Sequence, residues 1–186
     1  MTTIKSKLIV LVAAVLLTTP ALAIAQTQYG EQTYNYEQLG KKVRKVLVTL
    51  PYYGVFDNLE YRLEGNTVIL SGQVVRPTTR YDAGRRVARI AGVGTVVNNI
   101  EVLPLSPFDN NIRVRTYRAV FRSGGLFRYS LGANPSIHII VNRGRVTLEG
   151  IVSNRMDSQL AYVAANGVSG VFSVTNNLRS EDELVR

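Results

Sequence analysis

Residues 110–148 contain seven arginines and no acidic residue, so positive charge is concentrated in this stretch. Guanidinium groups bind phosphates and carboxylates through charge-assisted hydrogen bonds. Arg115, Arg118 and Arg122 follow one another at spacings of three and four, which places them on one face of a helix. The pattern therefore predicts an amphipathic helix whose polar face can bind an anionic surface.

Apolar residues accompany this basic face. Tyr117 and Phe121 lie on the opposite side of the helix, toward a core, whereas Leu126 and Phe127 follow in a short loop. Three arginines near an anionic membrane contribute about 3 kcal/mol, and each buried apolar side chain adds up to about 1.5–3 kcal/mol. If Leu126 and Phe127 instead belong to the core, charge alone leaves only transient attachment. The candidate lipid-binding residues are Arg115, Arg118, Arg122, Leu126, Phe127 and Arg128.

A second basic helix lies earlier in the chain. An offset of 74 residues aligns it with the first basic helix, but Val48 stands where Arg122 would be matched. An ordinary solvated helix face is the alternative interpretation for this segment, and it stays open for the later helix as well. The secondary basic face comprises Lys41, Lys42, Arg44 and Lys45.

The residues on which most enzymes depend are scarce. The chain has no cysteine, which excludes disulfides, thiol catalysis and thiolate metal sites. The single histidine, His138, alternates with Ile137 and Ile139 and is expected to face solvent from the opposite side of a strand. No nucleophile with a base, and no dinucleotide fingerprint, is present. The sequence therefore favours a protein without catalytic activity, metal or cofactor.

The first 25 residues have the features of a cleaved secretory signal. Lys5 and Lys7 precede ten apolar residues, and small residues offer cleavage after Ala25 or Ala23. Cleavage after Ala25 leaves 161 of the 186 residues, and the formal charge falls from +9 to +7. We expect a soluble periplasmic protein with an anionic partner, namely lipid headgroups, lipopolysaccharide, or an acidic protein or glycan. Export argues against nucleic acid.

The chain contains an internal repeat. Residues 59–102 align without a gap to residues 137–180, and ten of these 44 positions are identical. The clearest match is Val68-x-Leu70-x-Gly72-x-Val74 with the corresponding residues 146–152. Unrelated sequences of ordinary composition would share roughly two or three identities over this length.

Periodicity within each repeat predicts the order helix, strand, strand, helix, strand. The expected fold is α+β, with two αββαβ units that each form a three-stranded mixed sheet with two helices on one face. Because each unit is small, we expect the two to contact one another. Thr79 with Asp82 is expected to cap the second helix, and the four extra residues of the second unit fall near 131–135. The expected segments are a loose arm at 26–36, units at 37–103 and 110–179, a linker at 104–109 and a charged tail at 180–186.

The repeated pattern resembles the BON family, the domain named for bacterial osmotically inducible and nodulation proteins. The resemblance rests on the element order and on residues that occur in both units. In the first unit these are Val68, Leu70, Gly72, Val74, Ala83, Gly92, Val93, Val96 and Asn98, and in the second Val146, Leu148, Gly150, Val152, Ala161, Gly170, Val171, Val174 and Asn176. It implies a non-enzymatic periplasmic protein linked to phospholipid membranes, envelope integrity and stress tolerance.

The most regular motif positions have structural interpretations. Gly72 and Gly150 are expected where a helix approaches a strand, and Gly92 and Gly170 where helices end. The side chains of Asn98 and Asn176 are expected to form hydrogen bonds with backbone groups of a turn. Two functions therefore remain: association with anionic phospholipid membranes, or a protein-interaction module that docks an acidic envelope partner.

Overall fold

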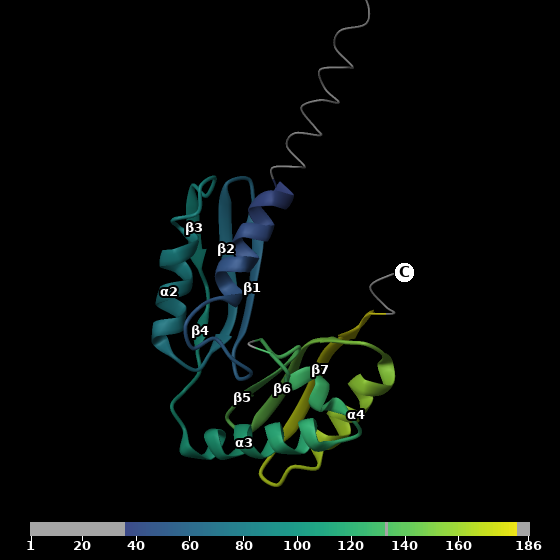
Figure 1. Ribbon diagram of the computed structural model, residues 1–186. Coiled ribbons are helices and arrows are strands. Elements are labelled where there is room, and N and C mark those ends of the chain that lie inside the picture. The colour runs from purple at the N-terminus through teal and green to yellow at the C-terminus, as the bar shows by residue number, and fades with distance from the viewer. Residues whose placement is uncertain (1–35, 133, 182–186) are drawn as a thin grey trace, which may run out of the picture. The chain divides into compact units, whose positions relative to one another are not determined.

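The computed structural model describes residues 36–132 and 134–181 of the chain. Within these residues the chain forms two consecutive αββαβ units with mixed sheets, an α+β fold (Figure 1). The expected signal at 1–25, nearly all of the arm and most of the tail lie outside the described residues. None of the helices in the described ranges combines the length and hydropathy needed to cross a bilayer.

The first unit opens with a helix over residues 36–48. Strand β1 (Asn58–Glu64) pairs antiparallel with β2 (Thr67–Val74), and β2 pairs in parallel with β3 (Thr95–Asn98) and β4 (Glu101–Val102). The last two strands share one register along β2, so they are two parts of the single edge strand that the pattern predicts. Helix α2 (Pro77–Val87) provides the crossover between β2 and β3.

The second unit repeats this topology. It consists of α3 (Pro107–Arg122), the 3-10 helix η1 (Leu126–Ser130), β5 (Ile137–Asn142), β6 (Arg145–Val152), α4 (Arg155–Asn166) and β7 (Ser173–Ser180). Strand β6 lies between β5 and β7, as β2 does in the first unit. Helix α3 begins inside the expected linker because Ser106 caps it, accepting a hydrogen bond from the Asp109 N–H at 3.1 Å.

Two details of the second helix in the first unit differ from the sequence prediction. Thr79 does not cap α2: the helix starts at Pro77, and Thr79 is buried within it. Proline at the first helical position has no N–H to satisfy, so the helix begins there without a side-chain cap. Helix α2 also ends at Val87, before the predicted stop at Gly92.

The repeated glycines Gly72 and Gly150 lie where the sheet backbone needs a positive φ and leaves no room for a side chain. Their φ angles are +111° and +127°, and an added Cβ would lie 2.2 Å from the Asn58 oxygen and 2.0 Å from the Ser136 oxygen. The expectation that a helix presses on these glycines was wrong, since the close neighbour is the chain at the start of the adjacent strand. No other residue fits both the conformation and the space.

The other motif residues connect helices to the last strand of each unit. Gly92 and Gly170 have φ angles of +100° and +92°, but they lie in turns beyond α2 and α4 rather than at the helix ends. The Asn98 side chain donates to the Arg80 carbonyl at 2.9 Å and accepts from the N–H two residues later. Asn176 makes the matching contacts in the second unit. The prediction that both asparagines satisfy backbone groups is confirmed.

The loop after the first helix supplies part of the second unit's core. Val55 and Phe56 pack against the buried cluster of the second unit, and the Phe56 and Tyr117 rings meet edge to face at 6.2 Å. The Val55 carbonyl accepts a hydrogen bond from the Ile139 N–H at 2.7 Å, extending the edge of β5. The predicted contact between the two units is therefore confirmed.

His138 lies under this same loop. Its Nδ1 is 3.2 Å from the Gly54 carbonyl and its Nε2 is 3.5 Å from the Tyr53 hydroxyl. Alternation along the strand placed the ring correctly, opposite Ile137 and Ile139, but the prediction that it faces solvent was wrong because residues 51–57 cover it. Burial lowers the pKa of His138, and hydrogen bonding to Gly54 opposes this shift only partly.

Gly150→Ala tests the backbone requirement. We expect a loss of at least about 2 kcal/mol in the free energy of unfolding, because the positive φ and the contact with the Ser136 oxygen both exclude a side chain. Gly167→Ala is the matched control, since Gly167 has an ordinary φ of −78° and its nearest neighbours would lie at 3.6 Å or beyond. Denaturant unfolding measures both variants, and equal effects would contradict the interpretation.

His138 should make stability depend on pH. Because burial lowers its pKa, the unfolded chain takes up the proton at a higher pH than the folded chain. The contribution of neutral His138 is therefore complete above the ordinary value of 6.5 and is lost progressively as pH falls below it. Unfolding curves between about pH 5 and 8 should show this slope in the parent and a smaller one in His138→Gln. Equal slopes would exclude His138 as the source.

Candidate functional site

The solvent-facing side of α3 carries the predicted arginine stripe. Arg115, Arg118 and Arg122 are exposed, while Tyr117 and Phe121 turn toward the core with ring centroids 4.8 Å apart. Arg115 donates to the Ser169 carbonyl at 3.5 Å. Within residues 36–132 and 134–181, no carboxylate forms an ion pair with any of the three arginines. The stripe thus lies where the sequence placed it, and its binding role stays a prediction.

The start of α3 is fixed by a buried carboxylate. Asp109 is 1% exposed and accepts hydrogen bonds from the Arg143 N–H at 2.9 Å and the Gly144 N–H at 2.8 Å. These N–H groups belong to the turn between β5 and β6. The contact holds the first turn of α3 against that hairpin, so the orientation of the arginine stripe is set by the sheet.

Leu126 is not available for membrane insertion. Its side chain is fully buried at the first position of η1, within the core of the second unit. Its assignment to the lipid-binding set was therefore wrong, because a side chain already removed from water gains nothing by entering a bilayer. Phe127, the next residue, is 58% exposed and stays in the candidate set.

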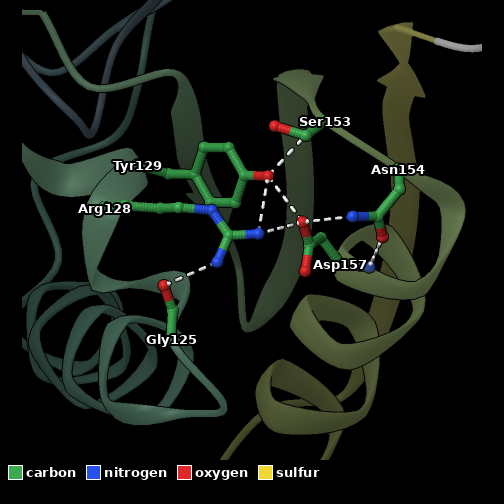
Figure 2. Close-up of polar contacts among 6 residues, drawn as sticks. All are labelled: Gly125, Arg128, Tyr129, Ser153, Asn154 and Asp157. Atoms are coloured by element: carbon green, nitrogen blue, oxygen red, sulfur yellow. Dashed lines mark hydrogen bonds and ion pairs between the residues drawn. The ribbon is translucent and has the colours of Figure 1, made fainter.

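Arg128 has a structural role that sequence reasoning did not find (Figure 2). Its guanidinium forms an ion pair with Asp157 and also bonds the Tyr129 hydroxyl at 3.2 Å and the Gly125 carbonyl at 3.1 Å. The hydrogen bond to Tyr129 is the largest influence that raises the pKa of Arg128. Since its charge is already matched by Asp157, Arg128 is less available to an anionic partner than the three α3 arginines, which form no ion pair within the described residues.

The Tyr129 hydroxyl sits at the centre of this network. It donates to Asp157 at 2.6 Å and accepts from the Ser153 N–H at 2.9 Å, while Asn154 donates to Asp157 at 3.0 Å (Figure 2). These contacts join η1 to the N-terminus of α4. They explain why the segment after α3 folds back onto the unit instead of extending as a loop.

Another arginine of the basic stretch is also structural. Arg113 is 3% exposed and donates to the Val141 carbonyl at 2.8 Å. Burial lowers its pKa, while the carboxylates of Asp109 and Asp57 act in the opposite direction. The count of seven arginines therefore overstates the charge that faces solvent.

The secondary basic face is the exposed side of the helix over residues 36–48. Val43 and Leu47 are buried on the core side of the helix over residues 36–48. The four basic residues, Lys41, Lys42, Arg44 and Lys45, are all exposed.

Sequence reasoning missed two exposed aromatic residues. Phe108, in the first turn of α3, is 58% exposed, and Phe172, just before β7, is 78% exposed. Phe108 precedes Arg115 by seven residues, which is two helical turns, so the helix period could have placed both on one face. Assigning residues 104–109 to a linker concealed this relation. For Phe172 no local sequence signal predicts its position beside Phe108.

Comparison with known proteins identifies the fold family. The BON domain matches twice, at residues 37–104 and 109–182. The described residues contain no group of three or more His, Cys, Asp or Glu side chains that could hold a metal ion. A search of characterised protein sequences finds no match.

Among solved structures, the chain is similar to CdsD, a structural protein of the type III secretion system of Chlamydia trachomatis. The C-terminal domain of CdsD matches with 11% identity and a TM-score of 0.30, covering 73% of this chain and 93% of that one. A second CdsD structure matches with 12% identity and a TM-score of 0.31, covering 80% and 95%. Similarity at this level carries no argument about function.

Tyr129→Phe tests the network around Asp157. We expect a loss of about 1–3 kcal/mol in the free energy of unfolding, because the Ser153 N–H and Asp157 each lose a partner. Tyr162→Phe is the control, since the Tyr162 hydroxyl makes no hydrogen bond within the described residues. Thermal or urea unfolding measures both, and a Tyr129→Phe variant as stable as the control would contradict a stabilising role.

Proposed function

Because the chain belongs to the BON domain family, we propose that it is a non-enzymatic envelope protein that attaches to anionic phospholipid membranes from the periplasm and supports envelope integrity under stress. Its family membership and the signal-like leader sequence support the proposed location. The proposal assigns no cofactor and no metal. The surface that makes the attachment is the solvent-facing side of α3.

One observation carries the proposal. Arg115, Arg118 and Arg122 form an exposed stripe on a well-anchored helix, and no acidic side chain in the described residues pairs with them. A protein surface that leaves three guanidinium groups unmatched is suited to a partner that presents many negative charges at once. Phospholipid headgroups meet this requirement, and the planar guanidinium can bind phosphate through two parallel hydrogen bonds.

The magnitudes favour reversible attachment. Each arginine close to an anionic membrane contributes about 1 kcal/mol, so the stripe supplies about 3 kcal/mol. Leu126 and Phe127 were the two apolar side chains expected to enter the membrane after the C-terminal end of α3. Because Leu126 is buried in the core, only Phe127 remains available at this end of the helix. Binding through α3 is therefore mainly electrostatic, and it should weaken as salt rises.

Replacing the stripe tests the function. In Arg115→Gln/Arg118→Gln/Arg122→Gln, affinity for vesicles of phosphatidylglycerol and phosphatidylcholine should fall by about two orders of magnitude, since about 3 kcal/mol of attraction is removed. The parent should bind vesicles of phosphatidylcholine alone far more weakly. Co-sedimentation over a range of salt concentrations measures all of these affinities.

The first unit supplies a control with the same change in net charge. Arg80, Arg86 and Arg89 are exposed arginines of α2 and its following turn, and none forms an ion pair within the described residues. Arg80→Gln/Arg86→Gln/Arg89→Gln should retain nearly all of the vesicle binding. If both triple variants lose affinity equally, net charge and not α3 is responsible. If the parent does not bind anionic vesicles, an acidic protein partner replaces lipid as the proposed ligand.

A further inference from the structure

We propose that the end of the second unit where α3 begins inserts two phenylalanines into the membrane. This inference rests on the proposed function and specifies which part of the surface enters the bilayer. The residues concerned are Phe108 of α3, Arg143 and Arg145 of the β5–β6 hairpin, and Phe172 of the turn before β7. We call them the aromatic tip.

The two exposed phenylalanines both lie next to Gly144, in the hairpin between β5 and β6. Phe108 is 58% and Phe172 is 78% exposed. They come from segments 64 residues apart in sequence, yet a Cβ built on Gly144 would lie 3.5 Å from the Phe108 ring and 3.7 Å from the Phe172 side chain. Neighbouring exposed aromatic side chains are unfavourable in water, and such patches mark surfaces that bind another phase or partner.

Arginines border this patch. Arg143 and Arg145 flank Gly144, and the Arg145 guanidinium carbon lies 5.7 Å from the centre of the Phe172 ring. Neither arginine forms an ion pair within the described residues. The carboxylate of Asp109 is close, but it is buried and bonded to the backbone of the same hairpin. The tip therefore presents apolar surface together with unmatched positive charge.

This combination identifies the partner as an anionic bilayer. A phenylalanine side chain has no polar atom to bond a headgroup or a carboxylate, so the partner must offer apolar volume beside its negative charges. The boundary between headgroups and acyl chains offers both, and aromatic residues beside arginines are typical of segments that lie there. A purely electrostatic partner, such as an acidic peptide, would leave both phenylalanines in water.

The tip is held in place before any ligand binds. Asp109 fixes the hairpin to α3, and the Phe172 N–H donates to the Gly144 carbonyl at 2.8 Å. Arg115 reaches the Ser169 carbonyl, so the turn that carries Phe172 also contacts α3. Little conformational entropy is therefore lost when the two rings enter a membrane, which lowers the cost of insertion.

The tip continues the arginine stripe. Phe108, Arg115 and Arg122 are spaced by seven residues, so they lie along one side of α3 over about 21 Å. A helix that rests on a membrane with this side down brings the arginines to the headgroups and Phe108 to the boundary in a single orientation. The stripe then provides attraction, and the tip anchors one end of the helix.

The first unit provides an internal comparison. At the repeat offset of 78 residues, Gly65, Thr67 and Gly94 occupy the positions of Arg143, Arg145 and Phe172. The two units share their topology, so the fold does not require these side chains. The first unit therefore lacks the two hairpin arginines and the Phe172 side chain at the matching positions.

Tryptophan fluorescence tests insertion directly, because the chain contains no tryptophan. Phe172→Trp introduces one reporter at the tip, and Met156→Trp introduces one at a residue of α4 that is 76% exposed. With vesicles of phosphatidylglycerol and phosphatidylcholine, emission from Phe172→Trp should shift to shorter wavelength. Lipids brominated in the acyl chains should quench it by at least about half, and Met156→Trp should change little. Co-sedimentation of the same samples reports how much protein is bound.

The outcomes separate insertion from attachment. If Phe172→Trp binds the vesicles but its emission and quenching match those of Met156→Trp, the proposed function stands and the insertion inference is wrong. If neither variant nor the parent binds anionic vesicles, both the proposed function and the insertion inference are wrong. If the blue shift appears without lipid and grows with protein concentration, the tip is an interface between copies of the chain, and the membrane insertion inference is wrong.

A second pair of variants measures the contribution of the tip to affinity. Phe108→Ser/Phe172→Ser should weaken vesicle binding by at least about tenfold, because two side chains of apolar surface no longer leave water. The dependence on salt should persist, since the arginines are unchanged. Met156→Ser/Val163→Ser removes two exposed apolar side chains from α4 and should bind as the parent does. Equal affinities for all three proteins would overturn the inference.

Discussion

The buried carboxylate of Asp109 is the contact on which the exposed surface of the second unit depends. A carboxylate out of water is unfavourable unless hydrogen bonds and opposite charge stabilise it. Here two backbone N–H groups of the β5–β6 turn bond it, and the Arg113 guanidinium lies close enough to interact electrostatically. The same contact joins the first turn of α3 to the hairpin tip. Phe108, the arginine stripe and the hairpin arginines consequently share one rigid support.

Burial and ion pairing divide the basic stretch into residues with different tasks. Arg113 supports the interior and Arg128 joins η1 to α4 through Asp157, whereas Arg115, Arg118 and Arg122 keep their charge in solvent. This division shows why a charge count is a poor guide to a binding surface. A guanidinium that is already paired with a carboxylate must lose that partner before it can bind a phosphate.

The two units show how one backbone plan carries two different surfaces. Both require a glycine at the close approach of the first two strands and an asparagine that ties the last strand to a helix. These positions were visible in the sequence because a backbone constraint permits few residues. Turns and exposed helix faces carry no such constraint. The second unit differs there, with arginines and a phenylalanine where the first has glycines and a threonine.

The sequence by itself determined the two units, the order of their elements and the exposed face of α3. These features follow from local periodicity and from repeated glycines at positions where the backbone conformation excludes other residues. It could not place residues whose surroundings come from distant parts of the chain. Leu126 was taken for a membrane contact and is buried, while His138 was taken for a surface residue and lies beneath residues 51–57. Phe108 and Phe172 became neighbours only in the folded molecule. Burial and neighbourhood are properties of packing between segments far apart in sequence, and tertiary structure alone decides them.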